Sequence, residues 1–195
     1  MKTIIYLSII FTLASCAITK QKYRYDISMV EPRESKELRY KDELIDIQFL
    51  FSEKRIGFSL NNLSNKGLII DWDKVSIVWR GEANKVFHTN VKYSEKEKTQ
   101  APTSIPPKAV LVDEILPIDA AYFSKGYSYG GTYIPGKWKE LNLFPEKKKT
   151  LKDEQKLKDR IGTTFGVYIP VEIGGEIREY NFVFRTDDIQ LESYK

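Results

Sequence analysis

The chain has 195 residues, which is the size of one ordinary domain. Hydrophobic residues make up 42% of it, a normal share for a globular protein, and this excludes wholesale disorder. Lys and Arg number 31 against 27 Asp and Glu, so the small positive excess is spread among many acids. Such a balance is not typical of a nucleic-acid binder, and we expect no nucleic-acid partner.

The N-terminal stretch MKTIIYLSIIFTLASCA has the features of an export signal. One positive charge, Lys2, precedes a run from Ile4 to Leu13 that is apolar apart from Ser8 and Thr12. A helix of this length spans about 15 Å, or about half of the hydrocarbon core of a bilayer. The run is therefore too short for a transmembrane anchor, and residues 1–15 fit a signal peptide.

The end of this run, Leu13-Ala14-Ser15-Cys16, resembles the lipobox of bacterial lipoproteins. The resemblance implies that Cys16 receives a diacylglyceryl group, that the peptide is cut before it, and that the new N-terminus is acylated, for example with palmitate. The membrane is then a partner through these acyl chains. Ala17 rather than Asp follows the cysteine, which by analogy with enteric sorting favours the outer over the inner membrane. The alternative is an ordinary signal peptide with a chance cysteine near its cleavage site.

Residues 16–42 are strongly charged and poor in core residues. Within them, YRYDISMV places Tyr23, Tyr25 and Ile27 on one face of a strand, and EPRESKE after it is typical of a loop. We interpret 16–42 as a lipid-anchored tether that ends in an edge strand, followed by a single domain over 43–195.

Period-two alternation dominates the start of that domain. The two runs ELIDIQFLF and KRIGFSL are joined by a short polar link, and this predicts a hairpin with one buried face. Its inward residues are Ile45, Ile47, Phe49 and Phe51 in the first strand and Ile56, Phe58 and Leu60 in the second.

The next run, GLIIDWDKVSIVW, changes phase in its middle. Ile70 and Trp72 share one parity, whereas Val75, Ile77 and Trp79 share the other. A one-residue slip exchanges the faces of a strand, so we expect a β-bulge or a tight bend near Asp73-Lys74.

Two long polar excursions interrupt the later strands. Residues 90–108 contain three prolines and read as a loop, and residues 144–160 are highly charged, with at most a turn or two of helix. The remaining strands are expected in ANKVFHT, AVLVDEILPI, TTFGVYIPV, EYNFVFR and DDIQLESYK, with Gly174-Gly175 as a hairpin turn. Strands without alternating helices predict an all-β fold, an antiparallel β-sandwich that is Ig-like or related.

The stretch GYSYGGTYIPGKW contains two motifs associated with enzymes. Its start matches the G-x-S-x-G nucleophile elbow around Ser128, but the only histidine, His88, precedes that serine. Gly130, Gly131 and Pro135 also oppose the helix that should follow it. Its second half matches most of a phosphate-binding loop, but Trp138 stands where the motif needs Ser or Thr. We therefore expect no catalytic residue here and interpret the glycines and proline as turn residues of a β loop.

The same stretch has a third interpretation as an exposed aromatic surface. Tyr127, Tyr129, Tyr133 and Trp138 could stack on sugars or anchor a protein interface. The alternative places these side chains in the core or at the rim of a sandwich. If the protein has a recognition surface, this stretch is the first candidate.

Metal and cofactor sites have weaker signals. Asp71 and Asp73 would share one face of a strand and could bind calcium, although such acids usually face water. His88 has no Cys or His partner for zinc. The run Lys147-Lys148-Lys149 could touch anionic headgroups, but nearby acids favour a solvated face. We predict no metal and no cofactor.

These patterns favour an exported, lipid-anchored envelope protein whose sandwich is a non-enzymatic binding or structural module for a protein or glycan partner. One alternative is an exported carboxylate-dependent hydrolase such as a glycosidase, which would need two acids lining a cleft. Another is a purely structural component, which would show a flat apolar patch.

Overall fold

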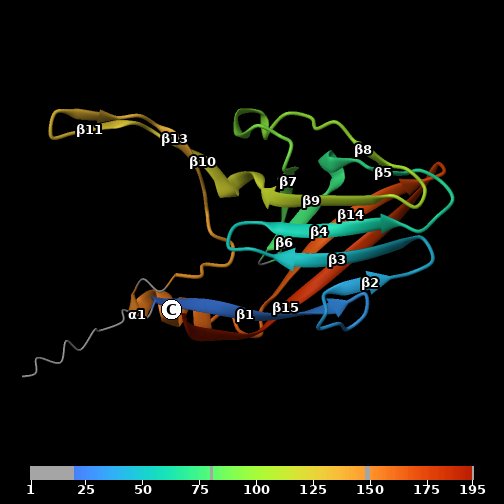
Figure 1. Cartoon of the computed structure of the whole chain (residues 1–195), viewed down its shortest axis with the longest axis horizontal. Helices are drawn as coiled ribbons and strands as arrows, with labels where there is room; N and C mark the ends of the chain where they lie inside the picture. The colour runs from blue at the N-terminus through green and yellow to red at the C-terminus, as the bar shows by residue number, and fades with distance from the viewer. Residues whose placement is uncertain (1–19, 80, 148–149, 195) are drawn as a thin grey trace, which may run out of the picture.

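The computed structural model describes residues 20–79, 81–147 and 150–194, so the predicted signal peptide and Cys16 lie outside the described residues. The described part is built almost wholly of antiparallel strands (Figure 1), which confirms the predicted all-β antiparallel class. None of its helices is long and apolar enough to cross a membrane.

One large sheet forms the body of the molecule. In spatial order its strands are β1 (Lys20–Glu31), β15 (Glu176–Tyr194), β14 (Thr164–Ile173), β6 (Ser76–Trp79), β7 (Glu82–His88), β9 (Val110–Pro117), β4 (Ile56–Asn62), β3 (Ile45–Phe51) and β2 (Arg39–Lys41). Two short strands, β5 (Leu68–Ile70) and β8 (Thr103–Ile105), extend it beside the end of β14.

Strand β7 turns this sheet into two facing layers. Its first half, Glu82–Lys85, pairs with β6, and its second half, Val86–His88, pairs with β9. The chain therefore passes from the layer of β1, β15, β14 and β6 to the layer of β9, β4, β3 and β2 without a break in hydrogen bonding. The result is a sandwich that is closed along one edge.

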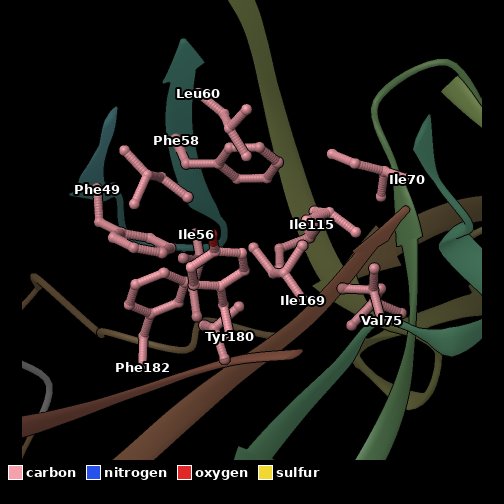
Figure 2. Packing of buried hydrophobic residues seen from close by; sticks show 14 of the residues in the cluster. Phe49, Ile56, Phe58, Leu60, Ile70, Val75, Ile115, Ile169, Tyr180 and Phe182 are labelled. Carbon is pink, nitrogen blue, oxygen red and sulfur yellow. The ribbon is translucent and has the colours of Figure 1, made fainter. Parts of the chain in front are cut away.

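The core lies between the β3–β4 hairpin and the strands β14 and β15 (Figure 2). The ring of Phe49 lies 4.9 Å from that of Phe182 and 5.0 Å from that of Phe184, in edge-on contacts. All three side chains are buried, whereas Leu50, the neighbour of Phe49, is 71% exposed. The predicted hairpin and its buried face are confirmed, with Phe51 half-buried at its end.

Strand β1 shows that the domain begins earlier than residue 43. It pairs with β15 from Lys20 opposite Tyr194 to Glu31 opposite Val183, and it buries Tyr23 and Met29. Register shifts after Asp26 and after Met29 break the simple alternation that the sequence would otherwise show. Most of the predicted tether is therefore part of the folded domain.

The interruptions in the strand pattern have local explanations. The phase change at residues 72–74 is a tight bend, the 3₁₀ turn η1 (Trp72–Lys74), which separates β5 from β6. The excursion over 90–108 is not a plain loop, because it contains η2 (Tyr93–Glu95) and β8. The excursion over 144–160 contains α1 (Leu151–Lys158), which Thr150 caps, as the predicted turn or two of helix.

One segment leaves the sandwich altogether. After η3 (Ile118–Ala120), the strands β10 (Ala121–Ser124) and β11 (Tyr127–Tyr129) run outwards, and β12 (Thr132–Ile134) and β13 (Lys137–Glu140) return beside them. We call residues 121–140 the arm. It projects from the body as a long, narrow hairpin (Figure 1).

Truncation of Phe182 tests the packing between the layers. Phe182→Ala removes a fully buried ring that contacts Phe49, and we expect it to lower the free energy of unfolding by about 3–5 kcal/mol. Leu50→Ala, on the outward side of β3, should change it by less than about 0.5 kcal/mol. Urea unfolding followed by circular dichroism measures both, and equal losses would contradict the layer assignment.

Candidate functional site

The tip of the arm is a two-residue β-turn. Gly130 and Gly131 have φ angles of 56° and 78°, and Tyr129 pairs with Thr132 across them. Two successive positive φ angles are typical of a type I′ turn, which matches the twist of a hairpin and strongly favours glycine. The Gly-Gly pair therefore reverses the chain.

Two further glycines lie opposite one another midway along the arm. A Cβ atom on Gly126 would lie 2.5 Å from the hydroxyl oxygen of Tyr133, and one on Gly136 would lie 2.7 Å from the ring of Phe123. The absence of side chains at these two positions lets the strands approach closely while an aromatic side chain covers each glycine. These glycines serve backbone packing.

Neither enzyme motif of this stretch has the geometry that its chemistry needs. Ser128 lies within β11, opposite Tyr133, and the chain continues through a turn into β12 rather than into a helix. The segment Gly131–Lys137 likewise runs through β12 to the first residue of β13, so no helix N-terminus faces a phosphate. A nucleophile elbow and a phosphate loop both require a following helix.

Three tyrosines of the predicted binding surface are largely exposed to solvent. Tyr127, Tyr129 and Tyr133 are 59%, 76% and 67% exposed. Cross-strand partners share a face, so Tyr127 and Tyr129 lie with Ile134 on one side, and Tyr133 lies with Ser128 on the other. The arm thus presents aromatic side chains on both faces.

Trp138, the fourth residue of that prediction, has a different position. It is half-buried at the root of the arm, where its ring stacks on Tyr93 at 5.7 Å and contacts Phe123 at 5.6 Å. The indole of Trp138 therefore holds β13 against η2. Of the four aromatic residues predicted to form the binding surface, three are exposed near the tip of the arm and Trp138 anchors its root.

A charged cluster completes the root. Glu140 accepts a hydrogen bond of 2.7 Å from the Tyr93 hydroxyl and pairs with the Arg55 guanidinium. Lys54 lies 3.7 Å from the same carboxylate. Burial alone would raise the pKa of Glu140, but the hydrogen bonds from Tyr93 and Arg55 outweigh it and lower that pKa. The arm is therefore held at a defined place beside the β3–β4 turn.

The charge of the arm is unbalanced. Lys125, Lys137 and Lys139 are exposed, and residues 120–139 contain no Asp or Glu. With Glu140 included, the arm carries a net charge of +2. Charge summed over the whole sequence hides this feature, which a count within the segment would have found.

The sequence also gave no sign of a buried cluster around His88. Its Nδ1 lies 2.9 Å from a carboxylate oxygen of Asp113, and its ring stacks on Trp72 at 4.2 Å. The Trp72 indole in turn donates a 2.8 Å hydrogen bond to the Thr103 hydroxyl. His88 and Asp113 are both buried, as is Gln100, whose amide donates to the Val86 carbonyl.

Asp113 is held in this cluster as a carboxylate. Burial opposes its charge, but hydrogen bonds from His88 and from the backbone of Glu114 and Thr89 outweigh burial and lower its pKa. Gln100 ties residues 90–108 to β7, and Asp113 ties β9 to the end of β7. His88 is thus a buried strand residue whose ring has hydrogen-bonding and stacking partners.

Four carboxyl groups of the described residues have a lowered pKa, because hydrogen bonds and ion pairs stabilise their charged form. They are Asp46, Asp113, Glu140 and Asp187.

The structure gives no support for a calcium ion bound by Asp71 and Asp73. Both residues belong to the 3₁₀ bend rather than to a strand face, which corrects their predicted placement. Lys74 lies 3.1 Å from the Asp71 carboxylate, and Lys85 lies 3.0 Å from that of Asp73. Within residues 20–79, 81–147 and 150–194, no three His, Cys, Asp or Glu side chains gather as a metal site would require.

None of the described clefts is lined by the tyrosines of the arm, although one of about 480 Å³ lies at its root, beside Ala120 and Leu141. Two clefts, of about 610 and 520 Å³, flank Tyr25 and Phe144, and neither is lined by an arm residue. The arm is a convex element, so it can enter or lie against a partner but cannot enclose a small ligand.

The chain was compared with protein families, curated proteins and solved structures, and nothing matched in any of the three. Its function must therefore be argued from its own residues. The strongest feature available for that argument is the arm.

The root cluster makes a pH-dependent prediction. Because the pKa of Glu140 is lowered from 4.5, its charge stabilises the fold above that value, and this contribution is lost as the pH falls through the lowered pKa. Glu140→Gln should cost about 1 kcal/mol at pH 7, and the cost should shrink as the pH is lowered. Glu97→Gln, at a highly exposed carboxylate, is the control and should cost little at any pH. Urea unfolding of both variants and the parent from pH 7 to pH 3 measures this, and a constant cost would contradict the assignment.

Proposed function

We propose that the protein is a lipid-anchored envelope protein, acylated at Cys16, whose β-sandwich is a non-enzymatic module that presents the arm to a partner. The observation that carries the proposal is the arm itself, with three exposed tyrosines on a firmly fastened root. An enzyme would need a reactive centre, whereas a binding module needs a rigid support and an exposed contact element.

Exposed tyrosines suit a contact element for a physical reason. Each offers a large apolar ring with a polar end, and it has few rotatable bonds to immobilise on binding. An isolated two-stranded hairpin is only marginally stable in water. Contact with a partner would therefore stabilise the arm and bury rings that water now covers.

The form of the arm favours an extended partner over a free sugar. A glycan site usually surrounds its ligand, and neither cleft near Tyr25 and Phe144 includes the tyrosines of the arm. The purely structural alternative is weaker, because the outward apolar residues Val110 and Val112 lie opposite Asn61 and Ser59 and form no continuous patch there.

The lipid anchor is tested at the cysteine. Cys16→Ala should abolish incorporation of labelled palmitate and move the protein from the membrane fraction to the soluble fraction or leave an uncleaved precursor. Separation of inner and outer membranes on a density gradient then tests the proposed outer-membrane location. Unchanged palmitate labelling in the variant would contradict the assignment of Cys16.

The role of the arm is tested in living cells. A photo-crosslinking residue in place of Tyr129 should give adducts, whereas the same residue in place of Ile177 should not. Both positions are exposed, at 76% and 57%, but Ile177 follows the β14–β15 turn in the body. Adducts should also fall in the Tyr127→Ser/Tyr133→Ser background. Equal crosslinking from both positions would contradict a specific role for the arm.

A further inference from the structure

We infer that the partner of the arm is the anionic headgroup layer of the membrane in which the protein is anchored. The inference rests on the proposed lipid anchor and on the proposed contact role of the arm. Its own evidence is the chemistry of the arm, the direction in which the arm projects, and the short length of chain between the anchor and the domain.

The composition of the arm matches the interface of a bilayer. Tyrosine and tryptophan prefer the headgroup level, where the ring meets acyl chains and the polar end meets water. Lysine extends its charge towards lipid phosphates, and each basic residue near an anionic surface adds to the attraction. The arm combines Tyr127, Tyr129 and Tyr133 with three exposed lysines, and its one acid, Glu140, is paired with Arg55 at the root.

The arm also points towards the end of the molecule that bears the anchor. In Figure 1 it projects towards the end of the long axis where β1 begins and α1 lies, whereas the β14–β15 turn is at the opposite end. Some basic residues at this end are paired, as in Arg24 with Glu192, 2.9 Å apart, and Lys158 with Glu154, 3.4 Å apart. Residues 146–160, which contain α1, carry seven Lys and Arg against four Asp and Glu, so the lysines of the arm add to a positive charge that this segment also carries.

Chain length keeps this end close to the membrane. Lys20, where β1 begins, is only four residues after Cys16. Four residues span at most about 14 Å, so an acylated Cys16 holds the start of β1 within that distance of the headgroups. The eight steps from Ala121 to Tyr129 extend about 26 Å at about 3.3 Å per residue. The arm is thus long enough to cross the gap that the anchor leaves.

An acidic protein surface could also attract three lysines, and the experiment separates the two partners. The full chain is produced with its acyl group, purified in detergent and reconstituted alone into vesicles. Tyr129→Cys carries an environment-sensitive fluorophore, and acylated Cys16 does not react with the thiol reagent. Ile177→Cys, at the far end of the body, is the matched control. Some vesicles contain phosphatidylglycerol and others only phosphatidylcholine, and each kind is made with and without a lipid-borne quencher.

We expect the label at position 129, but not at 177, to be quenched in vesicles that contain phosphatidylglycerol. Reversal of charge by Lys125→Glu, Lys137→Glu and Lys139→Glu together should lower the equilibrium constant for contact between arm and membrane by at least about fivefold per lysine, and quenching should fall accordingly. A thermal transition like that of the parent shows that the variant still folds. The inference is overturned if the labels at positions 129 and 177 are quenched equally. It is also overturned if quenching at position 129 changes neither with the lipid charge nor with the three lysine-to-glutamate substitutions.

The same preparation separates failure of the inference from failure of the proposed function. Flotation with vesicles that is lost in Cys16→Ala reports the lipid anchor alone. An anchored protein with an unquenched arm overturns the membrane contact, while the arm remains the contact element for a protein. A protein that does not float with vesicles overturns both the anchor and the inference.

Discussion

The packing of the β3–β4 hairpin across the sandwich is the interaction on which the rest of the structure depends. Phe49 meets Phe182 and Phe184 from the opposite layer, and all three rings are buried. This contact fixes the position of the β3–β4 turn, which carries Arg55. Since Arg55 pairs with Glu140, the root of the arm is placed by the same core. The arm is therefore a rigidly rooted extension of the sandwich rather than a loose connection.

The strands that could be predicted from the sequence are those with one buried face and an unbroken register. Ile45, Ile47 and Phe49 alternate with outward residues because β3 has the core on one side and solvent on the other. β1 was harder to predict, because two register shifts interrupt its alternation and charged residues occupy its outward side. Its pairing with β15 is set by contacts more than 150 residues apart, which no local pattern can show.

The candidate site was only partly predictable for similar reasons. The tyrosines of the arm were expected at a surface, and Tyr129 is one of the most exposed aromatic residues of the described chain. Trp138 was grouped with them, but its environment depends on Tyr93, which lies in a distant segment. The Gly130-Gly131 pair carried the same hairpin signal as Gly174-Gly175, and it could have predicted the arm. The neighbours of buried His88 come from three separate segments and leave no such signal.

The proposed lipid anchor at Cys16 and the proposed membrane contact of the arm strengthen each other. With Cys16 acylated, the start of β1 is held beside the headgroups, so contact between the arm and the membrane becomes an intramolecular event with a high effective concentration. Three lysines and a few aromatic rings then suffice, although they would bind a membrane weakly from solution. Two separated contacts also fix the orientation of the domain, which a single flexible anchor does not. In that orientation the β14–β15 turn, at the far end of the body, faces away from the membrane (Figure 1).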